Sequence, residues 1–178
     1  MIIGAQLLVP QVLTAAAVNA QISALNTRFA AATGWLGTVP SLPTSSDPRL
    51  NGVQDMWHKT FRELTRPGLG YMVGVLRAGK SELKASGKNR MTLPFWIECH
   101  GTASDQETTF QQACIIDQAA LYVLETLEGV AVANVTPPVA CVLISAADVE
   151  AINIDAAAAG KLLGIRRRYD LTIDDARS

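Results

Sequence analysis

Apolar residues recur at helical spacing near the start of the chain, after Pro10. Residues three and four positions apart lie on one face of a helix, so the stripe predicts a helix over residues 10–32. Proline suits the first helical position, and Gly34 is expected to end the helix. The stripe consists of Ala15, Val18, Ile22, Leu25 and Phe29.

A segment rich in proline and serine follows, from Gly37 to Gly52. Its composition disfavours both helix and strand, so we expect an ordered loop or linker. A second amphipathic helix is expected next, ending at Arg66, before Pro67. Its apolar face would consist of Val53, Trp57, Phe61 and Leu64.

The apolar period changes to two at Gly70, which predicts a strand over residues 70–77. Residues 90–100 alternate more clearly and predict a half-buried strand, in which Pro94 indicates a sheet edge or a bulge. Unbroken apolar character over residues 139–144 favours a central strand. The expected closing strand, residues 165–173, would place Ile165, Arg167, Tyr169, Leu171 and Ile173 on one face.

A capping box formed by Ser104 and Glu107 predicts a helix from there to about Leu127. The resulting order of helix, helix, strand, strand, helix, strand, strand is typical of an α+β fold. We expect a small, mostly antiparallel or mixed sheet of about four strands with helices packed on it. The predicted buried face of the helix consists of Phe110, Ala113, Cys114, Ile116, Ala120, Leu121 and Leu124.

The length of 178 residues favours a single domain, with a helical part at 1–66 and a sheet-and-helix part at 70–175. Hydrophobic residues at 49% and charged residues at 17% exclude a disordered chain. A net charge of −1 gives no general attraction to nucleic acid or anionic membranes. Polar residues interrupt the apolar stretch before Arg28, and no basic region precedes it. We therefore expect neither a signal peptide nor a membrane span.

Charge is nevertheless unevenly distributed along the chain. Residues 77–90 carry five basic residues against Glu82 alone, a local charge of +4, and predict a long basic hairpin arm. Residues 105–128 carry five acidic residues and no basic one. The basic residues are Arg77, Lys80, Lys84, Lys88 and Arg90, and the acidic residues are Asp105, Glu107, Asp117, Glu125 and Glu128.

The segment from Gly74 to Ser81 matches the phosphate-binding loop pattern G-x-x-x-x-G-K-S. In such a loop Lys80 would neutralise phosphate and Ser81 would hold magnesium, ahead of a helix whose N-terminus faces the anion. Only about one helical turn fits before Gly87, and the rest of the chain is too short for the alternating strands and helices of that fold. We favour a solvated arm and expect no cofactor, with a nucleotide-binding enzyme as the alternative.

Cysteine and histidine offer little further chemistry. Three cysteines, Cys99, Cys114 and Cys141, match neither a zinc pattern nor a disulfide framework and are expected to be buried fillers. Cys99 and His100 are strand neighbours that point to opposite faces, so they cannot form a catalytic pair with each other. His58 is expected on a helix surface. No catalytic or metal site is predicted.

Three consecutive arginines, residues 166–168, lie in the expected closing strand. Arginine forms bidentate pairs with either carboxylate or phosphate, so the run would suit a protein interface or nucleic acid. In a chain of nearly neutral charge, we favour ion pairs at a protein interface.

The predicted order is similar to that of the tail terminator and head–tail joining proteins of tailed bacteriophages. The resemblance rests on the N-terminal helix, the strands 70–77 and 90–100 joined by a long arm, the helix from Ser104, and the closing strand 165–173. It implies a structural protein of the virion tail or neck, assembled in the host cytoplasm. Such a protein forms a homo-oligomeric ring that caps the tail tube and joins it to the head connector. DNA would pass through the ring without sequence-specific binding.

A ring would bring the two charged segments together, because the arm of one copy would meet the acidic helix of the next. Pairing within one chain, or simple solvation, would explain the charges equally well. A small binding module of another assembly is a further alternative. The expected interface residues are Arg77, Lys80, Lys84, Lys88, Arg90, Asp117, Glu125, Glu128, Arg166 and Arg168.

Overall fold

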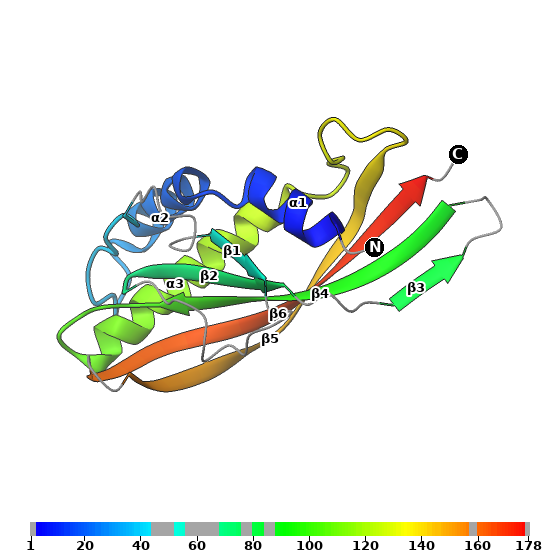
Figure 1. The fold of residues 1–178 in the computed structure, drawn as a ribbon. Helices are drawn as coiled ribbons and strands as arrows, with labels where there is room; N and C mark the ends of the chain where they lie inside the picture. Colours follow the sequence, from blue (N-terminus) through cyan, green and yellow to red (C-terminus); the bar gives the residue numbers. More distant parts are fainter. Residues whose placement is uncertain are drawn as a thin grey trace.

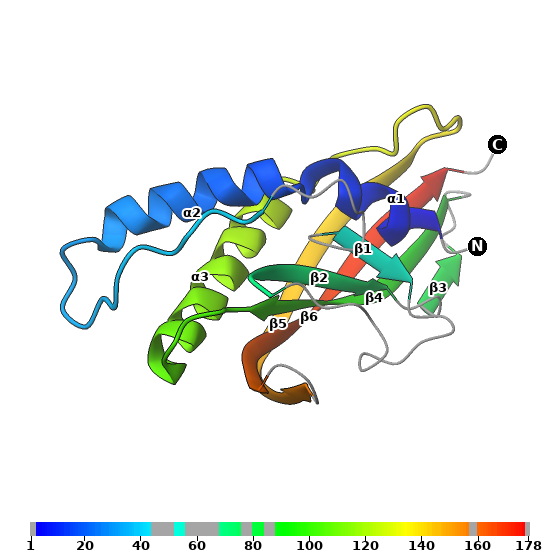
Figure 2. The same cartoon turned by 60° about the vertical axis from the view of Figure 1, so that its left-hand side comes forward.

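The structure, a computed structural model, describes residues 3–43, 52–55, 68–75, 80–83, 88–156 and 160–176. Within these residues the helices lie on one face of a six-stranded sheet (Figures 1 and 2), which confirms the α+β class. The helices are α1 (Ile3–Val12), α2 (Ala15–Phe29) and α3 (Gln106–Glu125). The strands are β1 (Gly52–Asp55), β2 (Gly70–Val75), β3 (Lys80–Leu83), β4 (Lys88–His100), β5 (Val139–Ala156) and β6 (Gly160–Ala176).

The sheet is mixed and mostly antiparallel, as predicted, but it has more strands than the four expected. Its order is β1-β2-β4-β6-β5, with β3 also paired to β4. Among the described strands, only β1 and β2 pair in parallel. Because β3 and β6 pair with the same residues of β4, they lie on opposite sides of that strand.

Pro94 lies within β4, a central strand. One side of β4 pairs with β6 along its whole length. On the other side β2 pairs as far as Phe95 and β3 begins at Thr92, so among the described residues Pro94 has no partner there. The proline, which has no N–H to donate, therefore occupies a local gap in the ladder.

The prediction of a central strand at residues 139–144 is wrong. These residues begin β5, which is the outermost strand next to β6. Two irregularities, between Cys141 and Leu143 and between Ala146 and Val149, interrupt its pairing with β6. The apolar run that suggested a fully buried strand instead lies partly exposed on the sheet edge.

The N-terminal part forms two helices where one was predicted. Pro10 lies inside α1 rather than starting a helix. Thr14 caps α2, because its side chain accepts a hydrogen bond from the backbone N–H of Ala17. Val18, Ile22 and Leu25 are buried as expected.

Residues 52–55, predicted to begin a second amphipathic helix, form strand β1 instead. The other residues of that predicted helix lie outside the described ranges. Val53 pairs with Val73 of β2 in parallel.

Helix α3 begins with a different cap from the one predicted. The carboxylate of Asp105, not the hydroxyl of Ser104, accepts from the backbone N–H of Thr108 at 2.8 Å. This hydrogen bond lowers the pKa of Asp105. The buried face is rotated slightly from the expected one, so Phe110 is exposed. Gly101 permits close packing there, since a Cβ at this position would lie 2.1 Å from the backbone oxygen of Thr109.

The core fills the space between the helices and one face of the sheet. Phe95 of β4 and Tyr169 of β6 stack with ring centroids 5.1 Å apart. Residues of β2, β4 and β6 that point to this face alternate with residues that point away, as the period of two predicted. The predicted apolar residues of the closing strand, Ile165, Tyr169, Leu171 and Ile173, are all buried.

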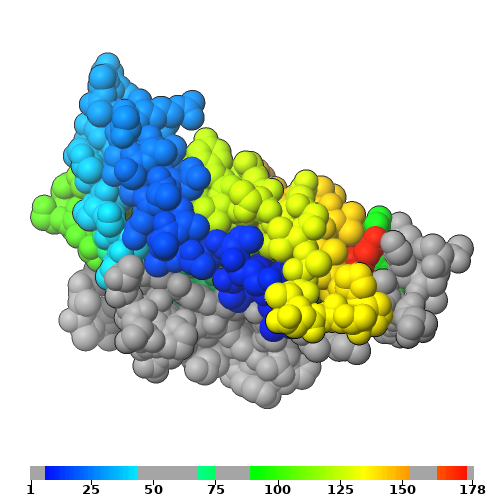
Figure 3. All heavy atoms as spheres, turned by 90° about the horizontal axis from the view of Figure 1, so that it is seen from above, coloured from blue at the N-terminus to red at the C-terminus, as the bar shows by residue number. Residues whose placement is uncertain are grey.

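An extended segment, residues 36–43, runs along α2 and covers part of the core; we call it the strap (Figures 2 and 3). Three carboxamide side chains hold its backbone. Asn26 donates to the carbonyl of Val39 at 2.8 Å and accepts from the Val39 N–H at 2.9 Å. Asn19 binds Leu42 in the same two ways. Gln111 of α3 likewise accepts from Leu36 and donates to Gly37.

We predict that Asn26→Ala lowers the free energy of unfolding by about 1–3 kcal/mol, because the buried backbone groups of Val39 would lose both partners. Denaturant unfolding measures the change. Thr27→Ala is the matched control: Thr27 is exposed on the same helix, and its loss should cost less than about 0.5 kcal/mol. Equal effects of the two substitutions would show that the hydrogen bonds between Asn26 and the strap contribute nothing to stability.

Candidate assembly interface

The sheet face that points away from the helices carries charged residues in cross-strand pairs. Arg90 of β4 lies opposite Asp174 of β6 and donates two hydrogen bonds to its carboxylate, at 2.7 and 2.8 Å. Arg166 lies opposite Glu98 and donates at 2.8 and 3.2 Å. Both arginines were predicted at a subunit interface. Each is paired within its own chain, and its place at a subunit interface stays a prediction.

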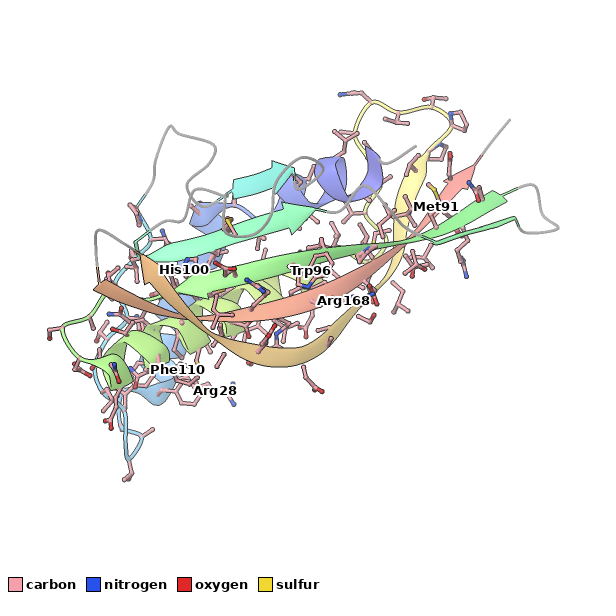
Figure 4. The ribbon with its side chains drawn as sticks, turned by 60° about the horizontal axis from the view of Figure 1, so that its bottom comes forward. Arg28, Met91, Trp96, His100, Phe110 and Arg168 are labelled. Carbon is pink, nitrogen blue, oxygen red and sulfur yellow. The ribbon has the colours of Figure 1, made fainter. Side chains whose placement is uncertain are left out.

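Arg168 occupies the same face between these pairs. Its guanidinium lies 5.8 Å from the ring centroid of Trp96, the residue opposite it on β4 (Figure 4). It also donates to Asp170 at 3.0 Å. Its side chain is half exposed. Of the three arginines in the run, it is therefore the one most accessible to another molecule.

Asp117 and Arg167 form a buried ion pair between α3 and β6. The two nitrogens Nε and Nη2 of Arg167 donate to the Asp117 carboxylate, with Nε at 3.1 Å from each oxygen. These hydrogen bonds raise the pKa of Arg167, against the opposing effect of burial. Nη1 donates to the carbonyl of Ala147 in β5 at 3.3 Å.

The expectation that Asp117 contributes to an acidic surface is therefore wrong. The residue is 3% exposed and its charge is matched inside the subunit. The buried position of Asp117 on α3 nonetheless indicates a cationic partner, because burying an ionised carboxylate without one would greatly destabilise the fold. Arg167, on the inner face of the closing strand, supplies that partner.

We predict that Asp117→Leu destabilises the fold by about 3–5 kcal/mol, because it leaves the Arg167 charge largely buried and unpaired. The double substitution Asp117→Leu with Arg167→Met should recover most of the loss, since it removes both charges. Chemical unfolding of the two variants and the parent measures the difference. If the double variant were as unstable as the single one, the loss would come from packing and not from an unpaired Arg167 charge.

His100 and Glu98 are fully buried on the outer sheet face. His100 Nε2 lies 2.8 Å from one Glu98 oxygen, while Arg166 binds the other oxygen. The remaining ring nitrogen, Nδ1, is buried and has no hydrogen-bond partner in the described part of the chain. Gly164 makes room for the ring, because a Cβ there would lie 2.9 Å from His100 Cδ2. Cys99 points to the opposite face and belongs to the core, as predicted.

The cysteines are free thiols, and two of the three are buried. Burial, followed by the nearby charges of Asp117 and Glu98, raises the pKa of Cys99 well above its ordinary value. Burial raises the pKa of Cys141 to about 11. Thiols with raised pKa values are poor nucleophiles at neutral pH. Among the described residues, no three metal-ligating side chains form a cluster.

Burial also raises the pKa values of two core tyrosines, Tyr71 and Tyr169. The Tyr71 hydroxyl donates to the carbonyl of Leu13 at 3.2 Å, whereas the Tyr169 hydroxyl has no hydrogen-bond partner among the described residues. The two residues thus form a matched pair for mutation.

We predict that Tyr169→Phe leaves stability at pH 7 unchanged or raises it, while Tyr71→Phe costs about 1 kcal/mol, because only Tyr71 makes a hydrogen bond there. A tyrosine whose pKa is raised on folding contributes stability that is complete below its unfolded pKa, about 10, and is lost above it. Tyr169→Phe should therefore also reduce the loss of stability at alkaline pH. Thermal unfolding between pH 7 and about pH 11 tests both effects. A large loss of stability in Tyr169→Phe at pH 7 would contradict this account.

The phosphate-loop pattern does not have the structural context it requires. Gly74 lies in β2, and Lys80 and Ser81 lie in β3, where they pair with Thr92 and Met91 of β4. A strand thus follows the pattern where a phosphate loop needs a helix. Residues 76–79 lie outside the described ranges.

The basic arm is described only in part. Lys80 and Lys88 belong to β3 and β4, and their side chains, like residues Arg77 and Lys84, lie outside the described part of the chain. The pairing of β3 with β4 has the geometry of a hairpin. A long basic arm that reaches a neighbour remains a prediction.

Besides Arg168, two predicted interface residues are exposed, Glu125 and Glu128, near the C-terminal end of α3. The Glu128 carboxylate accepts from the backbone N–H of Ile144 in β5 at 3.3 Å. The acidic end of the helix therefore lies against the start of the edge strand.

Sequence reasoning missed an exposed apolar surface on β5. Val142 is 40% exposed, Leu143 50% and Val149 43%. Asp148 and Glu150 flank Val149 and are also exposed. The acidic residues that alternate with apolar ones after Ser145 indicate an edge strand. The prediction of a central strand rested instead on the unbroken apolar run at residues 139–144.

Neither the comparison with family models nor that with curated proteins found a match to this chain. No helix within the described ranges is long and apolar enough to span a membrane.

Proposed function

We propose that this protein is a structural subunit of a tailed bacteriophage, a tail terminator or head–tail joining protein that forms a homo-oligomeric ring. The observation that carries the proposal is the edge strand β5, whose second half presents Val149 to solvent and pairs with no described residue on its outer side. An exposed aliphatic side chain on an unpaired strand edge is typical of a surface that another protein covers. The rest of the subunit has a well-buried core.

The arrangement of elements supports the type of assembly. A helix layer covers one sheet face, and the strands β2 and β4 are antiparallel neighbours. Helix α3 follows β4 in the chain, and β6 is the last strand of the chain. This is the order on which the resemblance to phage tail terminators rests. The ring would cap the tail tube and contact the head connector.

The charges of the outer sheet face also suit a structural role. Arg90, Arg166 and Arg168 each pair with a carboxylate of their own chain. A face with matched charges has little long-range attraction for phosphate. DNA would thus pass such a ring without binding to this face.

A nucleotide-binding enzyme is the less favoured alternative, because a strand and not a helix follows Lys80 and Ser81. A binding module of another assembly would share the exposed edge but would not form a closed ring. The mass of the protein in solution distinguishes the three proposals.

We predict one discrete multimer in light scattering and sedimentation, visible in negative stain as a ring with a central channel, and unchanged by magnesium and ATP. Lys80→Ala should not change this lack of response to magnesium and ATP. A monomer at every accessible concentration would contradict the ring. Thermal stabilisation by ATP that Lys80→Ala abolishes would favour the phosphate loop instead.

A further inference from the structure

The two halves of β5 differ in how their outer edge is covered. In the first half, Val132 donates to Val139 and Cys141 donates to Val130, so the segment 129–132 lies along the strand. Glu128 accepts from Ile144 just beyond it. The chain thus closes this part of its own edge.

The second half, Val149–Ala156, pairs regularly with Gly160–Arg167 on one side. On its other side no described residue pairs with it. Val149, Glu150 and Ala151 are exposed. An unpaired strand edge offers a row of N–H and C=O groups to another strand.

An irregularity between Ala146 and Val149 separates the covered half from the open half. Arg167 donates to the Ala147 carbonyl at this point, so the buried pair with Asp117 also holds the irregular segment. The open edge is therefore supported by the core of the subunit.

Strand β3 lies on the opposite side of the sheet. It pairs with Asn89–Thr92 of β4 on one side, and among the described residues nothing pairs with its other side. Among the described residues, β5 and β3 thus have different open edges on opposite sides of the sheet, and the outer side of the short strand β1 is also unpaired. A contact between unlike edges is heterologous, and such contacts close into a ring when the rotation permits.

The charges around the two edges differ in sign. From Val139 to Gly160 the chain has three acidic residues and no basic one: Asp148, Glu150 and Asp155. Strand β3 itself carries Lys80 and Glu82, but the segment 77–90 that contains it has a local charge of +4, of which Arg90 is paired with Asp174. Two β5 edges would bring like charges together, which disfavours pairing. An acidic edge and a strand within a basic segment attract and set the orientation of the contact.

We propose that the open edge of β5, Val149–Ala156, binds strand β3 of a second copy and extends the sheet from one subunit to the next. This inference rests on the proposed ring and names the contact that builds it. The partner is therefore another copy of this chain, and the acidic end of α3 is not the main contact for the basic segment.

The test compares Val149→Lys with Val142→Lys by sedimentation over a range of protein concentrations. Both residues are exposed to nearly the same extent on the same strand, but Val142 lies on the half that the chain itself covers. Val149→Lys should weaken multimer formation at least about tenfold, because an edge lysine opposes strand pairing. Val142→Lys should change it less than about twofold. Both monomers should unfold at nearly the parental temperature.

Charge reversal provides an independent arm of the test. Glu150→Lys and Lys80→Glu should each weaken the multimer, most at low salt, and the double variant should recover part of the loss. Hydrogen exchange should show residues 149–156 more protected in the multimer than in the diluted monomer, with residues 142–144 unchanged.

The outcomes separate the two proposals. A parental ring that Val149→Lys leaves intact, or that both lysine variants weaken equally, overturns the edge contact and leaves the ring proposal standing. A parental protein that never associates overturns both. Protection confined to α3 would assign the contact to the acidic helix instead.

Discussion

The buried ion pair between Asp117 and Arg167 is the interaction on which the arrangement of this subunit depends. It joins the middle of α3 to the inner face of β6, and Arg167 also reaches the carbonyl of Ala147 in β5. Removing two charges from water is costly, so the geometry must satisfy both groups. The position of α3 over the sheet is therefore constrained by polar chemistry as well as by apolar packing.

The same interaction links the core to the sheet edge. Val149 lies directly opposite Arg167 in the register of β5 and β6, immediately after the irregular segment that Arg167 holds. A one-residue slip of β6 against both β4 and β5 would turn Arg167 to the outer face and separate it from Asp117. The Asp117–Arg167 pair thus also helps to fix the register of β5, and with it the residues of β5 that are exposed to solvent.

Much of the fold follows from periodicity. The alternation in β4 and β6 correctly separates Phe95, Ile97 and Tyr169 on the inner face from Trp96 and Arg168 on the outer one. The α+β class follows from the order of elements. These predictions succeed because the period of side chains along a strand is a local property.

Other features depend on contacts between distant residues and could not be predicted from the sequence. Arg166 and Glu98 are 68 residues apart, and only the register of β4 and β6 makes them neighbours. The edge position of β5 depends on strand order, which the apolar run at 139–144 does not encode. Ser104 and Asp105 are both good helix caps, and the choice between them depends on where α3 packs.

The structure separates charges that are matched within one chain from charges on the exposed edge strand. Asp117, Arg90 and Arg166 are matched within the subunit, where their pairs hold the sheet and helix layer together. Asp148 and Glu150 lie on the exposed edge strand and were not among the interface residues predicted from charge.

This separation has a physical reason. A subunit that exists alone before assembly must not pair its open strand edge indiscriminately, and a bulge with acidic neighbours discourages contact between two identical edges. The same acidic residues do not oppose a basic edge. In the proposed ring, charge at the edge would select the partner, whereas charge inside the subunit stabilises the frame that presents the edge.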